Sequence, residues 1–287
     1  MILVTGSTGQ LGQIVIEKLS EKIPTSQIAA LVRDATKAEH LTAKGIDVRV
    51  GDYQNGDSLL AAFQGVEKLL LISSNDFNDR LGQHKNVIDA AHKAGVKHVF
   101  YTGVTMNDIN SSPLKPILEE HYLTEEYLKA SGLSYTFLQN SLYAEVIPMF
   151  LGENVVKTGV FFPAGEGKVA FAAREDLGEA TANILVGEGH ENQTYHLTGS
   201  EIVSFEEVAA TLSELSGKAV PYINPENEVF EGALKQFGLP EPIIQMSVLF
   251  AAGIKNNDFN KTYDNLEKFL GRKPTNIKTY LKAAYKL

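Results

Sequence analysis

The chain contains no cysteine among its 287 residues. This absence excludes disulfide bonds, metal sites built on thiolates, and catalysis by a cysteine nucleophile. No group of histidine and carboxylate residues has the spacing of a metal site, so we expect no bound metal. The Gly-x-Ser-x-Gly elbow that presents a serine nucleophile in many hydrolases is also missing. The sequence therefore disfavours catalysis by a thiol, by a bound metal or by a serine nucleophile on such an elbow.

Positive charge is scarce as well. The chain has 26 Lys and Arg against 35 Asp and Glu, a formal net charge of −9. Because nucleic-acid binding depends on basic side chains that neutralise phosphates, we expect no nucleic-acid partner. No apolar run is long enough to cross a membrane, and Met1 leads directly into an apolar strand, so we expect neither membrane insertion nor a signal peptide. The sequence predicts a cytoplasmic globular protein, either a monomer or a homodimer.

The most informative segment is the start of the chain, where Gly6, Gly9 and Gly12 follow an apolar strand and open a helix-forming run over residues 13–20. In this pattern the first glycine allows a tight turn, the second lets the backbone approach a phosphate, and the third lets the helix pack against the strand. A helix N-terminus attracts anions through its free N–H groups and its dipole. The pattern predicts a dinucleotide-binding turn, with a purely structural strand–turn–helix as the alternative. The residues expected to hold the pyrophosphate are Gly6, Ser7, Thr8, Gly9, Gln10, Leu11 and Gly12.

The end of the second strand indicates which dinucleotide binds. Residues 28–32 form an apolar run typical of a buried parallel strand, and Arg33 follows it about 20 residues after the last glycine. An NAD site needs an acid there for the ribose 2′-hydroxyl, whereas a guanidinium binds a 2′-phosphate. Arg33 therefore favours NADP(H), unless it is a solvated charge paired with Asp34. A third strand over 47–53 carries Asp52, which is either a ligand of the adenine amino group or an ordinary turn residue.

Strands and helices alternate up to about residue 150. Further strands are expected over 68–72, 97–102 and 133–138, with helices over 58–63, 83–94 and 119–131. This alternation predicts an α/β fold, a Rossmann-type doubly wound parallel sheet with helices on both faces. Ligands bind such sheets at the carboxyl ends of the strands. Those ends carry Ser73, Ser74, Asn75, Thr102 and Asn140, which we expect to line the cofactor site.

The second half is less regular and predicts a small C-terminal α/β substrate domain. A helix over 174–186 and a last strand over 194–199 are expected to return to the main sheet. Ser204 begins another helix, with Glu207 three residues later as in a capping box. A short strand over 220–223 is expected to pair with residues 161–162. The expected domains are a cofactor domain over 1–150 and 170–199, and a substrate domain over 151–169 and 200–287.

Five runs together carry a family resemblance. They are residues 4–12, which match TGxTGxxG, and residues 30–34, 51–53, 64–74 and 139–143. The chain resembles the NmrA-like branch of the atypical short-chain dehydrogenase/reductases over essentially its whole length. Within that branch it is most similar to the bacterial NADPH-dependent quinone oxidoreductases.

This resemblance implies that a Rossmann domain binds NADP(H) and that hydride passes to a quinone in a cleft against the second domain. By position, Arg33 would hold the 2′-phosphate and residues 73–75 would line the ribose and diphosphate. Asn140 and Tyr143 would lie near the nicotinamide and the substrate. The alternative within the family is a non-catalytic redox sensor that binds NADP(H) and acts through a protein partner. A third interpretation is reduction of another flat conjugated acceptor, such as a dye or an azo or nitro compound.

The helix after the fifth strand lacks the Tyr-x-x-x-Lys pair of ordinary members of the superfamily, in which the tyrosine protonates an alkoxide. Tyr122 is followed four residues later by Glu126, and Tyr127 by Ser131. This loss disfavours alcohol dehydrogenation and sugar epimerisation, because both need a strong proton relay. Quinone reduction tolerates the loss, since a hydroquinone anion is far less basic than an alkoxide and water can protonate it.

Two residues are candidates for a catalytic role, His121 and Tyr143. His121 lies one helical turn before Glu125, and it is either a donor to a quinone oxygen or half of a helix-surface pair. Tyr143 and Tyr101 are candidates to flank the quinone ring, although buried tyrosines are also common core residues.

Overall fold

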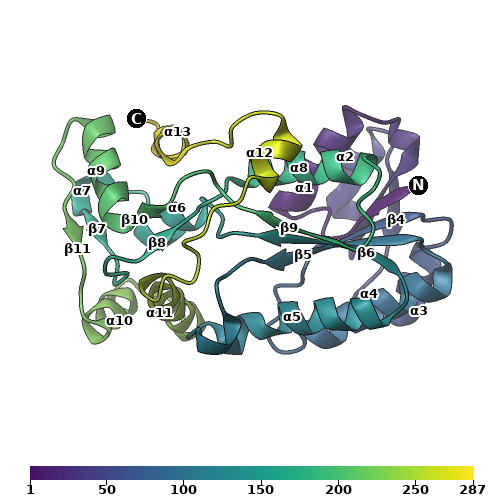
Figure 1. The fold of residues 1–287 in the computed structure, drawn as a ribbon, viewed down its shortest axis with the longest axis horizontal. Coiled ribbons are helices and arrows are strands. Elements are labelled where there is room, and N and C mark those ends of the chain that lie inside the picture. Colours follow the sequence, from purple (N-terminus) through teal and green to yellow (C-terminus); the bar gives the residue numbers. More distant parts are fainter.

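A seven-stranded parallel sheet forms the centre of the larger part of the molecule (Figure 1). The computed structural model describes residues 1–287. The strands are β1 (Ile2–Val4), β2 (Ile28–Val32), β3 (Asp47–Val50), β4 (Lys68–Leu71), β5 (His98–Val104), β6 (Ser134–Asn140) and β9 (Gln193–Leu197). Their order is β3-β2-β1-β4-β5-β6-β9, so the direction of winding reverses between β1 and β4. This order confirms the predicted Rossmann-type α/β fold.

Helices cover both faces of this sheet, which explains why its inner strands are apolar on both sides. One face carries α1 (Gln10–Ser20), α2 (Glu39–Thr42), α8 (Arg174–Val186) and α12 (Asn265–Leu270), and the other carries α3 (Gly56–Ala62), α4 (Arg80–Ala94) and α5 (Lys115–Ala130). The two contact layers form separate apolar cores, one around Val15 and Leu177 and one around Phe63 and Leu128. Every residue of β2 and β5 is buried.

Glycine allows the closest helix contact on the first face, between α1 and α8. A Cβ atom at Gly178 would lie 2.4 Å from Cγ2 of Ile14, so any larger residue would push the two helices apart. Glycine also ends α4, because Gly95 adopts a φ of +78° that L side chains rarely take. The close contact at Gly178 therefore sets the position of α1 against α8, and with it the start of α1.

The smaller part of the molecule contains six helices and two short strand pairs. The helices are α6 (Val146–Leu151), α7 (Val155–Thr158), α9 (Phe205–Ser216), α10 (Asn227–Gln236), α11 (Glu241–Lys255) and α13 (Ile277–Tyr285). The strands are β7 (Val160–Phe161), β8 (Lys168–Val169), β10 (Val203–Ser204) and β11 (Tyr222–Ile223). The expected pairing of residues 220–223 with 161–162 is confirmed, because β11 pairs with β7. The capping box at Ser204 and Glu207 is confirmed too.

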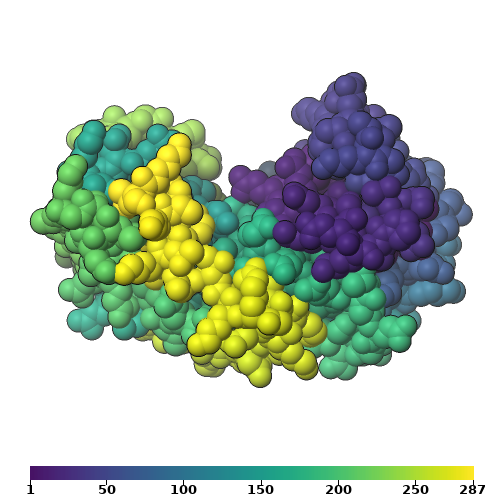
Figure 2. All heavy atoms as spheres, turned by 90° about the horizontal axis from the view of Figure 1, so that it is seen from above, coloured from purple at the N-terminus to yellow at the C-terminus, as the bar shows by residue number.

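An aromatic cluster forms the core of this smaller part. The ring of Phe162 lies 4.9 Å from Phe150, 4.5 Å from Phe205 and 5.6 Å from Phe230 between centroids. Seen from above, the surface is hollowed between the purple N-terminal part and the green and yellow C-terminal part (Figure 2). The division into two domains stays a prediction. Within residues 200–287, α12 packs on α8 and β9 of the larger sheet.

Several helices begin earlier than the sequence predicts. The predicted starts at residues 13, 83 and 119 fall inside α1, α4 and α5, which begin at Gln10, Arg80 and Lys115. The first turns of α1 and α4 each carry a single large apolar residue and a glycine, and that of α5 contains Pro116, so none shows the periodicity from which a helix is recognised. None of the helices is both long and apolar enough to cross a membrane.

Candidate dinucleotide site

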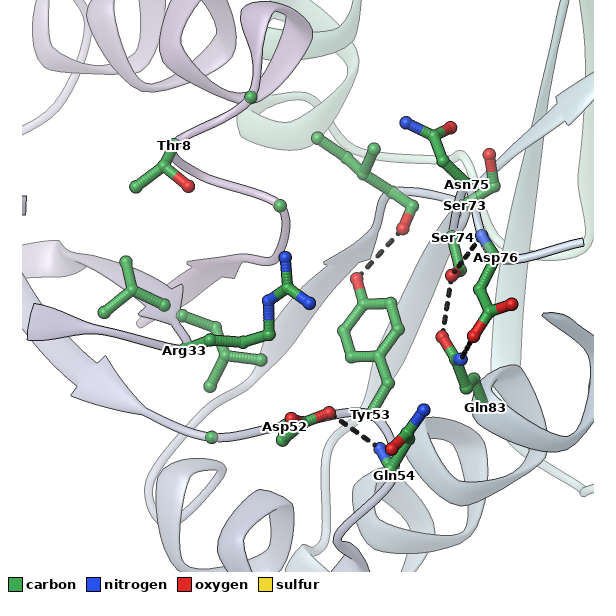
Figure 3. Close-up of a pocket in the computed structure, with 16 residues that line it drawn as sticks. Thr8, Arg33, Asp52, Tyr53, Gln54, Ser73, Ser74, Asn75, Asp76 and Gln83 are labelled. Atoms are coloured by element: carbon green, nitrogen blue, oxygen red, sulfur yellow. Dashed lines mark hydrogen bonds between the residues drawn. The ribbon is translucent and has the colours of Figure 1, made fainter. Parts of the chain in front are cut away.

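A cavity of about 580 Å³ lies at the carboxyl ends of β1, β2 and β4. It is lined by residues from the glycine-rich turn, from the ends of β2 and β4, from the loop after β3 and from α4 (Figure 3). The predicted cofactor residues in its wall are Gly6, Thr8, Gly9, Arg33, Asp52, Ser73, Ser74 and Asn75. The cavity thus brings together segments from the first 83 residues, at the edge where a doubly wound sheet binds ligands.

The glycine-rich turn has the geometry of an anion site. Gly6 has a φ of +57°, and its carbonyl accepts a hydrogen bond of 2.9 Å from the N–H of Gly9. A Cβ atom at Gly12 would lie 2.3 Å from that same carbonyl oxygen, so only glycine lets α1 start this close to the turn. The N–H groups of Gln10, Leu11 and Gly12 donate no hydrogen bond within the protein. Three unbonded donors at a helix N-terminus favour a phosphate.

Three residues of the predicted turn act differently from its glycines. The side chain of Ser7 is buried and donates a hydrogen bond of 2.7 Å to the carbonyl of Leu31, so it supports the turn from below. Leu11 belongs to the apolar core beneath α1. The exposed amide of Gln10 accepts a hydrogen bond from Arg174. For Leu11 and Gln10, the backbone N–H is the group available to an anion.

Arg33 extends from the end of β2 into the space between Thr8 and Tyr53 (Figure 3). Its guanidinium is exposed and makes no hydrogen bond or ion pair. The alternative, a pair with Asp34, is wrong, because the Asp34 carboxylate accepts from the hydroxyl and the N–H of Thr36. Those bonds lower the pKa of Asp34. A free guanidinium beside an anion-binding turn suits a second phosphate group.

The loop after β3 supplies the wall opposite the glycine-rich turn. One oxygen of Asp52 accepts a hydrogen bond of 3.0 Å from the N–H of Gln54, and the other makes none. The hydroxyl of Tyr53 lies within hydrogen-bonding distance of the Ile72 carbonyl, at 2.9 Å, and of the Thr5 hydroxyl. Burial raises the pKa of Tyr53, so the phenol is neutral. Its hydrogen bonds connect the loop after β3 to the end of β4, and its ring lines the cavity. Asp52 keeps one carboxylate oxygen available to a ligand.

The loop after β4 is held by the first turns of α4. Ser74 donates its N–H to Nε2 of His84 at 2.9 Å and its hydroxyl to Gln83 at 2.6 Å, and its carbonyl accepts from Arg80 at 2.9 Å. Gln83 also donates to the carboxylate of Asp76 at 2.7 Å (Figure 3). All polar groups of Ser74 are therefore bonded within the protein. It shapes the cavity wall instead of offering a free hydroxyl.

The hydrogen bonds of His84 determine its tautomer. Its Nδ1 lies 2.9 Å from the hydroxyl of Thr124, and that hydroxyl donates to the Glu120 carbonyl at 2.7 Å. Nδ1 must therefore carry the proton, and Nε2 accepts from Ser74. Burial, together with the nearby charge of Arg80, lowers the pKa of His84 to about 3. The ring is a neutral link between α5 and the cavity wall.

The predicted surface pair of His121 and Glu125 is wrong. Both side chains are buried on the inner face of α5. Nδ1 of His121 lies 2.8 Å from the Tyr101 hydroxyl, and burial holds the pKa of His121 well below its usual range. Glu125 instead accepts two hydrogen bonds from the amide of Gln139, at 2.9 and 3.0 Å, and burial raises its pKa to about 7. Tyr101 is fully buried, so the expectation that it flanks a bound ring is wrong.

The ends of β5 and β6 bring the remaining predicted residues together outside the cavity wall. The buried hydroxyl of Thr102 accepts a hydrogen bond of 2.9 Å from the N–H of Ser73 and so supports the loop after β4. The amide of Asn140 lies 3.4 Å from the hydroxyl of Tyr143, while its Oδ1 is buried with no partner. An unbonded buried acceptor is costly, so a donor from outside the protein would be favourable at this oxygen.

The residues that sequence reasoning missed come from helices and from loops. Gln83 of α4 lines the cavity, and Arg174 at the start of α8 lies over the ring of Tyr143. Asp76 and Gln54 lie on loops, just beyond the predicted Asn75 and Asp52. Only these two had a signal in the sequence, because each continues a strand end that was already identified.

These groups fit a dinucleotide that carries an additional phosphate. The three unbonded N–H groups of α1 suit the diphosphate, the free guanidinium of Arg33 suits a 2′-phosphate, and the orphaned Oδ1 of Asn140 suits a carboxamide. Along the carboxyl edge of the sheet, Arg33 follows β2, the turn before α1 follows the neighbouring β1, and Asn140 ends β6 further along.

Comparison with known proteins extends over almost the whole chain. The model of the NmrA-like family matches residues 1–281. The chain is 41% identical over 278 residues to quinone oxidoreductase 2 of Escherichia coli strain K12, covering 96% of each protein. It is 35% identical over 256 residues to the NAD(P)H azoreductase of Xenophilus azovorans, covering 88% of this chain and 86% of that protein.

Solved structures agree with this relationship. The NADPH complex of the quinone oxidoreductase from Escherichia coli superposes with a TM-score of 0.93 at 39% identity, covering 99% of this chain and all of that one. The triphenylmethane reductase of a Citrobacter species, in complex with NADP(H), gives the same TM-score, identity and coverage. Because the family model and full-length relatives above 30% identity both match, this chain belongs to the NmrA-like family.

Proposed function

We propose that this protein is an NADPH-dependent oxidoreductase that reduces quinones by hydride transfer. The observation that carries the proposal is the unpaired guanidinium of Arg33, which extends into a cavity walled by the glycine-rich turn. An acid at this position would repel a 2′-phosphate, whereas a free guanidinium attracts it. The full-length relatives that are a quinone oxidoreductase and an NAD(P)H azoreductase support the same class of reaction.

The proposed roles at the cofactor end follow from the available groups. Gly6, Thr8 and Gly9 leave room for the diphosphate, and the N–H groups of residues 10–12 donate to it. Arg33 binds the 2′-phosphate and Asp52 accepts from the adenine amino group. Ser73, Ser74 and Asn75 form the wall beside the ribose, with Ser7, Leu11, Gly12 and Thr102 as structural support.

The proposed reaction end lies at Asn140 and Tyr143. NADPH, when bound, supplies the hydride, so the protein's task is to align the two flat rings and exclude water. Oδ1 of Asn140 accepts from the carboxamide of the nicotinamide, and the ring of Tyr143 packs beside the acceptor. His121 is the candidate hydrogen-bond donor. Its Nδ1 lies 2.8 Å from the hydroxyl of Tyr101, and the tautomer in which that hydroxyl donates carries the ring proton on Nε2.

The relatives favour a second acceptor class for the same site. One is an azoreductase and another is a triphenylmethane reductase, and both names point to conjugated aromatic acceptors. A site that aligns rings by stacking has few polar contacts with which to distinguish a quinone from such a dye. We expect the protein to be a monomer or a homodimer.

The experiment that tests this function is a comparison of NADPH and NADH oxidation, followed by near-ultraviolet absorbance, with and without a simple benzoquinone. An azo dye and a triphenylmethane dye are assayed in parallel, and gel filtration gives the oligomeric state. We expect turnover well above the spontaneous rate, faster with NADPH than with NADH. Tight NADPH binding without turnover on any acceptor would contradict an enzyme and favour a redox sensor that acts through a protein partner.

A further inference from the structure

Arg174 is a cation beside the proposed reaction end that the sequence analysis did not identify. It is the first residue of α8, and its N–H donates to the two carboxylate oxygens of Glu145 at 3.1 and 3.3 Å. Its Nη1 donates to Oε1 of Gln10 at 2.6 Å, and its Cζ lies 4.5 Å from the centre of the Tyr143 ring. One guanidinium therefore contacts the start of α1 and the ring of Tyr143.

The backbone holds these segments next to each other. Tyr143 forms a parallel bridge with Ala172, and the N–H of Ala144 donates to the Ala172 carbonyl at 2.9 Å. The segment that leads into α8 thus runs beside the segment that follows β6. Gln10 and Arg174 begin the two helices that pack most closely on this face of the sheet. The backbone therefore places Arg174 and Tyr143 next to each other, independently of the contact between their side chains.

The charge of Arg174 is not used in a close ion pair. Its nearest carboxylate oxygen, on Glu145, is 3.9 Å from Nη1, beyond hydrogen-bonding distance. The close contacts of the guanidinium are a neutral amide and an aromatic face. A planar guanidinium that lies over a ring fixes the tilt of that ring. The remaining N–H donors of the guanidinium hold the guanidinium itself in place. This arrangement suits a clamp better than a surface ion pair.

We propose that Arg174 is a positioning residue that holds the Tyr143 ring at a fixed place relative to the dinucleotide-binding turn. This inference rests on the proposed function, because it assigns the ring of Tyr143 to the acceptor. The contacts run from Gln10 through Arg174 to Tyr143, and from there to Asn140, whose Oδ1 has no partner. Loss of the guanidinium frees the ring and leaves the phosphate-binding groups in place. It therefore lowers kcat and leaves the affinity for NADPH unchanged.

A double-mutant cycle on the full chain tests this coupling. The variants are Arg174→Gln, Tyr143→Leu and the pair together, each assayed for kcat, for KM and for the dissociation constant of NADPH. We expect Arg174→Gln to lower kcat about tenfold, the scale of a misaligned reactant, with the dissociation constant of NADPH changed by less than about twofold. In the Tyr143→Leu background the same substitution should have no further effect, because the ring that it positions is gone.

Arg272, in the loop after α12, gives a matched control that contacts the same helix. It donates to Asp176 at 2.8 Å and to Glu179 at 2.6 Å, both on α8, so Arg272→Gln loosens α8 without touching Tyr143. We expect Arg272→Gln to lower thermal stability with kcat unchanged. Three results would each overturn the inference. Arg174→Gln could lower kcat equally with and without the Tyr143 ring, or Arg272→Gln could lower kcat as much as Arg174→Gln does. Arg174→Gln could also raise the dissociation constant for NADPH about tenfold.

A fluorescence measurement separates this inference from the proposed function. The chain contains no tryptophan, so a Tyr143→Trp variant has a single indole whose emission reports on that position. We expect Arg174→Gln to shift the emission of this variant and Arg272→Gln to leave it unchanged. If the emission shifts but the protein turns over no acceptor, the proposed function is contradicted and the clamp is not. The absence of a shift would contradict the clamp, whatever the protein reduces.

Discussion

At the scale of single residues, Arg33 decides the charge of the proposed cofactor site. Its guanidinium has no partner, so the full positive charge is available in the cavity. The neighbouring carboxylate of Asp34 is bonded to Thr36 and does not pair with it. A phosphate dianion gains a bidentate contact at this point, whereas a 2′-hydroxyl gains little.

We predict that Arg33→Ala raises the KM for NADPH at least about tenfold and changes the KM for NADH by less than about twofold, since a charge-assisted bidentate contact is lost only with NADPH. Steady-state kinetics with both cofactors measure this split. Lys37→Ala is the control, because Lys37 is a nearby exposed cation outside the cavity wall. Equal effects on the two cofactors would remove Arg33 from the 2′-phosphate role.

Residues at strand ends could be predicted from the sequence, and residues on helices could not. Arg33, Asp52 and Ser73 each follow a recognisable strand, and the edge of a parallel sheet brings such positions together. Gln83 and Arg174 reach the site only because α4 and α8 pack as they do. This packing cannot be predicted from the local sequence of either helix. His121 and Glu125 were misread as surface residues because polar side chains at helical spacing usually face water.

At the scale of elements, the first turns of α4 determine the shape of the cavity wall. Arg80, Gln83 and His84 each hold a different polar group of Ser74, so the loop after β4 has one arrangement. The neutral ring of His84 also connects this loop to Thr124 on α5. A helix that packs on the sheet thus fixes a loop that would otherwise be free to move.

We predict that His84→Phe raises the KM for NADPH several-fold and lowers the free energy of unfolding by about 1–3 kcal/mol, because the N–H of Ser74 loses its buried acceptor. Steady-state kinetics and urea denaturation measure the two effects. His92→Phe is the matched control, since His92 is exposed on the same helix. An unchanged KM would show that the loop keeps its shape without this bond.

The strands were predicted better than the helix starts. β2 has the predicted bounds, because five consecutive apolar residues between turn signals are unambiguous. The early starts of α4 and α5 were missed, since α4 begins with the largely polar turn Arg80–Gln83 and α5 has Pro116 in its first turn. The smaller part was hardest to predict, because its two strand pairs contain only two residues per strand and depend on contacts between distant segments.

At the scale of the whole molecule, Glu125 links stability to pH. Burial raises the pKa of this carboxyl to about 7, from 4.5 for an unperturbed group, although the amide of Gln139 acts in the opposite direction. Between these values the folded protein keeps the proton that the unfolded chain releases. Stability from this group is therefore fully present below the lower value and is lost as the pH rises through the upper one, by about 3 kcal/mol at most.

We predict that the wild-type protein loses stability relative to Glu125→Gln as the pH rises from about 5 to about 8, because only the wild type must ionise a buried carboxyl. Urea denaturation of both proteins at the two pH values measures the difference, in which other titrating groups cancel. Glu126→Gln is the control, since that neighbouring side chain is 69% exposed. A difference that does not vary with pH would mean that Glu125 titrates normally.

The path of the chain constrains how this architecture can be divided or exchanged. β9 completes the main sheet beside β6, yet β7 and β8 of the smaller part precede it in the sequence, and β10 and β11 follow it. A fragment that ends near residue 150 would lack β9 and leave β6 as an open edge, which invites pairing between molecules. The smaller part therefore cannot be exchanged as one contiguous segment, because β9 interrupts it. Exchanging it requires two separate insertions, one on either side of β9.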